Sequence, residues 1–253
     1  MEAFISEIDQ NFEVFFDEVE VNINSVINGQ KSEECKDKFK KSYRRLVSYQ
    51  AWISEILEEV ACTESISFFK EAQNDALASH ALARQGAWRV SLMSLRSCIE
   101  NTVFGVYYLE HPVELKLWTL GKHKLGFTES VNYLTKHPAF IDLADASING
   151  IEDLKAEYST LSKAVHGSSK LFRMTKTGSI EGLNIQSNPD FGGWQSRERS
   201  VISAINLLLL TFFRDDLSGA VNSNLRKAVS ISIPDAKFSK IKEHYKVNLK
   251  KQT

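Results

Sequence analysis

The chain of 253 residues contains only 4 prolines and 3 cysteines. Proline removes a backbone donor and interrupts helices, so its scarcity favours long helices. The cysteines, Cys35, Cys62 and Cys98, are widely spaced and include no CxxC pair. This spacing argues against a disulfide framework or a zinc site and indicates a reducing compartment.

The sequence also lacks a long apolar run. The longest, Ala204–Phe213, is too short to cross a bilayer, which needs about 20 residues, and it predicts a buried helix instead. The first residues, MEAFISEIDQ, have neither the basic nor the apolar segment of a signal peptide. We therefore expect a soluble, cytoplasmic protein without a membrane partner.

Motifs for several enzyme classes are missing as well. GKHKLG lacks the GK[ST] ending of a phosphate loop, and neither HExxH nor GxSxG occurs. The six histidines are scattered without the spacing of metal ligands. The sequence accordingly predicts no metal and no cofactor.

Although the net charge is only −1, the charges are unevenly spread. Residues 1–34 hold nine acidic side chains against Lys31 alone, whereas residues 224–253 hold eight Lys/Arg against Asp235 and Glu243. A basic tail can contact nucleic acid. The alternatives are a solvated surface, or pairing with an acidic surface such as the N-terminal helix of the same chain or a partner protein.

Apolar residues recur at steps of three and four through most of the chain, which predicts amphipathic helices. We expect helices over residues 4–27, 35–60, 65–84, 87–109, 151–166, 198–217 and 223–229, with short helices inside the irregular segment 112–150. The glycine-rich region 167–194 predicts a small β-hairpin or an ordered loop near residues 170–186. The fold class is therefore all-α: an N-terminal helical hairpin (1–60), a helical-bundle core (65–217) and a basic C-terminal helical extension (218–253).

One polar stripe stands out on the expected helix 87–109. Arg89, Arg96 and Glu100 lie within about 20° of one line along that helix. Arg96 and Glu100 are four residues apart and can pair. One interpretation is a solvent-exposed ion pair. Because the surrounding sequence is nearly free of charge, the other interpretation is a functional cation and carboxylate on a largely buried helix.

His166 is the centre of a second group, at the end of the expected helix 151–166. Tyr158 and Ser162 precede it by eight and four residues, and Lys163 lies on the same flank. A histidine in the last helical turn followed by Gly167 is also a common way to end a helix. Beyond the helix, Arg173 is among the cations that could fold over the imidazole.

These two segments, RVSLMSLRSCIENTVFGVYYLEHP (89–112) and YSTLSKAVHGSS (158–169), resemble the HEPN superfamily of prokaryotic toxin–antitoxin, abortive-infection and phage-defence systems. The resemblance covers about residues 65–217 and implies a helical bundle that forms dimers or joins a partner from the same system. It also implies metal-independent RNA cleavage: the 2′-hydroxyl attacks the adjacent phosphate, histidine is the acid and base, and arginine stabilises the charged phosphorane. On that basis the catalytic set is His166, Arg96 and Glu100, and the substrate-binding set is Lys163, Arg173, Tyr158, Ser162 and Arg89.

The chain departs from the family's nuclease motif, in which arginine precedes histidine with four to six residues between them. Positions 159–161 are Ser, Thr and Leu. Two functions therefore stay open: an effector or toxin that acts as an endoribonuclease on RNA, and a non-enzymatic scaffold, regulator or defence-complex subunit that has lost the arginine. A third is a nucleic-acid-binding accessory protein that uses the basic C-terminus.

Overall fold

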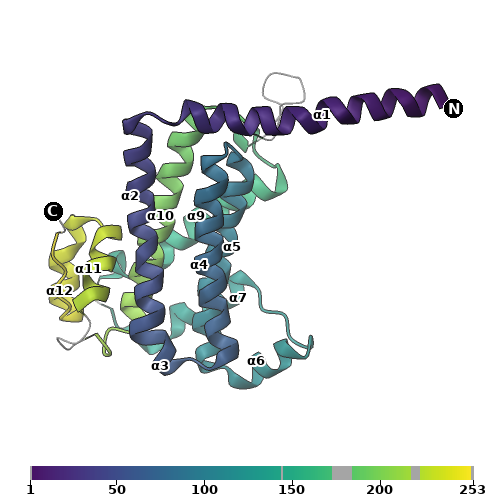
Figure 1. Ribbon diagram of the computed structural model, residues 1–253. Coiled ribbons are helices and arrows are strands. Elements are labelled where there is room, and N and C mark those ends of the chain that lie inside the picture. Colours follow the sequence, from purple (N-terminus) through teal and green to yellow (C-terminus); the bar gives the residue numbers. More distant parts are fainter. Residues whose placement is uncertain (1, 144, 173–183, 218–222, 252–253) are drawn as a thin grey trace.

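The computed structural model describes residues 2–143, 145–172, 184–217 and 223–251 (Figure 1). Within these residues the chain is helical and contains no strand, which confirms the all-α prediction. The helices are α1 (Glu2–Gly29), α2 (Glu33–Trp52), α3 (Glu58–Val60), α4 (Thr63–Arg84), α5 (Trp88–Glu110), α6 (Pro112–Thr119), α7 (Phe127–Lys136), α8 (Pro138–Ile141), α9 (Ile151–His166), α10 (Asn188–Phe212), α11 (Ser223–Ser232) and α12 (Phe238–Tyr245). Short π and 3₁₀ turns lie at Ile53–Leu57, Ala146–Ile148, Lys170–Phe172 and Asp235–Lys237.

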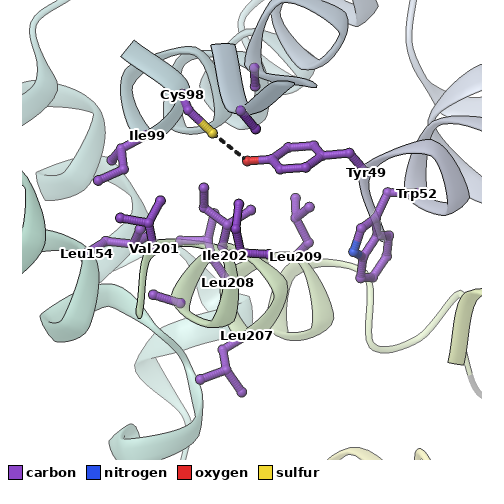
Figure 2. Packing of buried hydrophobic residues seen from close by; sticks show 14 of the residues in the cluster. Tyr49, Trp52, Cys98, Ile99, Leu154, Val201, Ile202, Leu207, Leu208 and Leu209 are labelled. Carbon is purple, nitrogen blue, oxygen red and sulfur yellow. Dashed lines mark hydrogen bonds between the residues drawn. The ribbon is translucent and has the colours of Figure 1, made fainter. Parts of the chain in front are cut away.

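Helix α10 lies inside the bundle formed with α2, α4, α5 and α9 (Figure 1). Every side chain from Ala204 to Thr211 is buried, so this half of the helix is surrounded on all sides, as the apolar run predicts. Figure 2 shows Leu154 of α9 and Ile99 of α5 packed around its leucines. Burial of this helix defines the positions of its neighbours.

Three polar side chains of α10 are buried, and each has a partner on another helix. Glu198 accepts hydrogen bonds from Arg45 of α2, and burial raises the pKa of its carboxyl even though Arg45 lowers it. Asn206 accepts from Trp52 Nε1 at 2.9 Å. Thr211 bonds the hydroxyl of Tyr245 at 2.8 Å. Because buried polar groups are costly when unpaired, these contacts specify how α2 and α12 dock on α10.

The start of α10 differs from the prediction, which began this helix near residue 198. The helix begins at Asn188, where Ser187 Oγ accepts the N–H of Asp190 at 3.2 Å and Pro189 lies in the first turn. A capping serine and an early proline are strong start signals, and they outweigh the low helix propensity of the glycines that follow.

The predicted β-hairpin or ordered loop near residues 170–186 falls mostly on residues 173–183, outside the described residues. On its N-terminal side, Lys170–Phe172 form a 3₁₀ turn. The helix predicted over residues 35–60 is nearly continuous, with a π turn at Ile53–Leu57.

One hydrophobic cluster includes residues of α2, α4, α5, α9, α10, α11 and α12, so the three segments of the predicted domain division share a core. Helix α1 is the exception: it projects from the top of the bundle, roughly perpendicular to α2 (Figure 1). Among the described helices, none is long and apolar enough to cross a membrane.

A substitution at Gly150 can test how closely the start of α9 approaches α10. It precedes α9 with φ +75°, and a Cβ built there would lie 2.2 Å from the carbonyl oxygen of Ala204. Gly150→Ala should therefore lower the free energy of unfolding by about 3 kcal/mol, measured by urea denaturation. Gly121→Ala is the matched control: its φ is +69°, but a Cβ added there would meet no atom within 4 Å, so only about 1 kcal/mol of backbone strain is expected. Equal losses at the two sites would contradict the close approach.

Candidate functional site

Helices α5 and α9 pack side by side and run in opposite directions (Figure 1). The stripe of Arg89, Arg96 and Glu100 on α5 faces the polar flank of α9. Arg89 reaches the end of α9, whereas Arg96 and Glu100 contact its middle. The structure therefore brings the stripe on α5 together with Tyr158 and Ser162 of the second group.

The guanidinium of Arg96 is the centre of this contact. Its Nε donates to Ser162 Oγ at 3.1 Å, and its Nη2 donates to the hydroxyl of Tyr158 at 2.6 Å. Both Nη atoms also bond the carboxylate of Glu100, at 3.1 and 2.9 Å. The side chains of Arg96 and Glu100 are only 21% and 22% exposed. Internal partners therefore use most of the donors that a phosphate would need.

Tyr158 joins a third helix to the contact. Its ring stacks on Phe127 of α7, with centroids 3.6 Å apart, and the guanidinium carbon of Arg96 lies 4.7 Å from the centroid of the Tyr158 ring. Its hydroxyl donates to Glu100 at 2.9 Å. Burial, followed by the charge of Glu100, raises the pKa of Tyr158, so the phenol stays protonated near neutral pH. The contacts of Tyr158 therefore connect α9 with α5 and α7.

Arg89 caps the C-terminus of α9. Its Nε donates to the carbonyl oxygen of Ala164 at 2.9 Å, and its Nη2 donates to that of Val165 at 3.2 Å. Gly167 follows in the left-handed conformation, with φ +59°. The last carbonyls of a helix lack intrahelical partners, so Arg89 satisfies two of them and holds the end of the helix.

His166 lies on this last turn of α9 and is exposed. In the part of the chain that the structure describes, it makes no hydrogen bond or ion pair, and the same holds for the exposed Lys163. Arg173 lies outside the described residues. The cation that the structure places beside the helix end is thus Arg89, which precedes His166 by 77 positions in the chain.

Sequence reasoning missed a cluster at the C-terminus of α5. Glu110 accepts hydrogen bonds from Tyr133 and from His137 Nε2, beside a pocket of about 400 Å³. His137 Nδ1 accepts the N–H of Ala139 at 3.1 Å, so both of its ring nitrogens are occupied. This pairing connects α5 with α7 and α8. Its members are far apart in sequence, and only the fold identifies them.

The buried cysteine offers no nucleophile. Cys98 bonds the hydroxyl of Tyr49 at 2.9 Å (Figure 2), and burial raises the pKa of its thiol to about 12. A thiol with this pKa is not ionised near neutral pH. Among the described residues, no group of three His, Cys, Asp or Glu side chains could hold a metal ion.

Comparison with known proteins finds no matching family model, no matching curated protein and no matching solved structure. The interpretation of the site therefore depends on its geometry and on the resemblance of the two quoted segments.

The Arg96 contact makes a stability prediction. Arg96→Met leaves Glu100 partly buried without its cation, so the free energy of unfolding should fall by about 2 kcal/mol in urea denaturation. Tyr158→Phe keeps the stacking on Phe127 and should cost about 1 kcal/mol. In the double variant Arg96→Met/Glu100→Met no charge is left unpaired, so at least half of the loss should be recovered. A single variant as stable as the wild type would contradict the structural role of Arg96.

Proposed function

We propose that this protein is a HEPN-like helical subunit of a prokaryotic defence system that acts by docking to protein partners through α1. The observation that carries this proposal is the exposed apolar surface of α1. Phe12, Phe15 and Phe16 are 55%, 60% and 64% exposed. Contiguous exposed apolar surface on a protein commonly marks an interaction site.

Among the described residues, α1 is anchored to the body of the protein at its last turns. Val26 is buried, and Arg84 of α4 donates to the carbonyl oxygen of Ile27 at 3.1 Å and to the side chain of Gln30 at 2.9 Å. The anchored end aims the rest of the helix away from the bundle (Figure 1). An isolated helix is marginally stable in water, so a long amphipathic helix gains stability when a partner covers its apolar side.

The state of Arg96 favours docking over catalysis. A cation that stabilises a phosphorane must offer free donors to the phosphate oxygens. Arg96 has instead committed its donors to Ser162, Tyr158 and Glu100. The HEPN-like segments then serve as the scaffold that carries α1.

We expect the apolar side of α1 to be required for function. Phe12→Ser/Phe15→Ser should abolish phage protection, measured as efficiency of plating on cells that express the chain with its neighbouring genes. Val14→Ser/Val21→Ser is the matched control, because these valines are 58% and 64% exposed on the opposite side of the same helix. The control should retain protection, and so should His166→Ala.

Circular dichroism of all three variants must match the wild type. Protection that survives Phe12→Ser/Phe15→Ser, or that is lost equally in the control, would contradict the docking role of α1.

A second function, metal-independent cleavage of RNA, is favoured by one observation: Arg89 lies against the helix end that bears His166. An imidazole nitrogen can take the proton of a 2′-hydroxyl. The 2′-oxygen would form a bond to phosphorus while the bond to the 5′-oxygen breaks, and a proton would be returned to that oxygen.

This function predicts that the purified full chain cleaves single-stranded RNA in the presence of a metal chelator and leaves 2′,3′-cyclic phosphate ends. His166→Ala should then lower the cleavage rate at least about 100-fold without changing stability. Arg89→Lys should reduce cleavage as well, because a lysine lacks the planar donor pair that holds the carbonyls of Ala164 and Val165 and thereby positions the helix end bearing His166. A wild-type chain without cleavage, or a His166→Ala chain with the wild-type rate, would remove this candidate.

A further inference from the structure

Most of the apolar residues of α1 share one side of the helix, and acidic residues flank that side. Its apolar side chains form an arc about 100° wide that includes Phe4, Ile8, Phe12, Phe15, Val19, Ile23 and Val26. Residues 1–30 contain no lysine or arginine. Their carboxylates flank this arc, with Asp9, Glu13 and Glu20 along one edge and Glu7 and Glu18 along the other. The surface is thus an apolar strip between two acidic borders.

This distribution of apolar and acidic residues favours some binding surfaces for α1 and disfavours others. Anionic lipid headgroups would repel both acidic borders. Two α1 helices packed through their apolar strips would bring carboxylates against carboxylates, which is the arrangement that disfavours pairing in coiled coils. The complementary surface is an apolar groove with a rim of lysines and arginines.

A groove rich in cations lies away from α1 in the same chain. It has a volume of about 940 Å³ and lies between α2, α10, the end of α11 and the segment that follows. Its lining is mixed: most of its side chains are polar or charged, and Ile231, which is 39% exposed, and Pro234 add apolar surface. The volume is in the range of clefts that accept ligands, so the groove has room for large side chains.

Cations surround this groove. Lys41 pairs with Asp37 at 2.7 Å, and Lys251 pairs with Asp235 at 2.9 Å, so their charges are partly compensated. Arg44 and Arg199 are exposed on the rim and form no hydrogen bond or ion pair with any described residue. These two guanidinium groups are available to carboxylates of another molecule.

The acidic helix and the basic groove of one molecule do not meet. Helix α1 leads away from the bundle on the side opposite to α11 and α12 (Figure 1). The complementary partner for α1 is therefore the groove of a different copy. A contact between two different surfaces of identical chains is heterologous, and it builds rings or open arrays.

We propose that α1 of one copy docks in the groove lined by Arg44, Arg199 and Ile231 of a second copy, in a head-to-tail arrangement. This inference rests on the proposed docking role of α1 and names its partner. The phenylalanines enter the groove, and the acidic borders of α1 face its arginine rim.

Charge reversal of each surface tests the arrangement, with the full chain followed by sedimentation velocity over a range of concentrations. The wild type should associate, and added salt should weaken the association. Arg44→Glu/Arg199→Glu and Glu13→Lys/Glu20→Lys should each raise the dissociation constant at least about tenfold. An equimolar mixture of the two variants should associate again, because each then offers a surface complementary to the other.

Lys116→Glu/Lys122→Glu is the control for net charge, because it reverses two exposed lysines outside the groove. Its association should match that of the wild type. A monomeric wild type, association that Arg44→Glu/Arg199→Glu leaves unchanged, or binding of the wild type to vesicles of anionic lipid would each overturn the head-to-tail arrangement. None of these results removes the docking role of α1, which depends on the plating of Phe12→Ser/Phe15→Ser against its valine control.

Discussion

The burial of the C-terminal half of α10 is the constraint on which the rest of the structure depends. From Ala204 to Thr211 every side chain is buried, and α2, α5, α9 and α11 pack against this helix. The few polar groups on α10 then need partners within those neighbours. Two of these partners are on α2: Arg45 bonds Glu198, and Trp52 bonds Asn206. The third is Tyr245 of α12, which bonds Thr211. Apolar burial thus holds the bundle together, and a small number of polar contacts specify the orientation of its helices.

Much of this fold could be predicted from the sequence, because it depends on local patterns. The apolar run at Ala204–Phe213 predicted the buried helix, and steps of three and four located most of the others. The predicted start of α10 near residue 198 is wrong: Gly192 and Gly193 are typical of a loop, but the helix begins at Asn188 after the capping Ser187. The orientation of α1 could not be predicted either. Its apolar periodicity reaches Phe4, and the same pattern would describe a helix buried in the core.

At the candidate site, the sequence predicts which residues share one side of a helix but not which residues they contact. Periodicity alone placed Arg89, Arg96 and Glu100 on one side of a helix, but it could not identify the element that they face. Once α5 and α9 are antiparallel, Arg96 meets Tyr158 and Ser162, and Arg89 meets the carbonyls before His166. The arginine beside the end of α9 thus comes from another helix and not from the residues just before His166. Contacts between helices depend on packing, which a pattern along one helix does not contain.

The uneven distribution of charge along the chain explains which surfaces the protruding helix α1 can bind. Acidic residues gather in the first 34 positions and basic residues in the last 30. If the attraction between these two segments only stabilised the fold, the acidic helix would be expected to pack against the basic segment of the same molecule. The structure instead holds α1 away from the bundle through Val26, Arg84 and Gln30. In the proposed head-to-tail arrangement this attraction would act between molecules, and the exposed phenylalanines of α1 would become buried at the same contact.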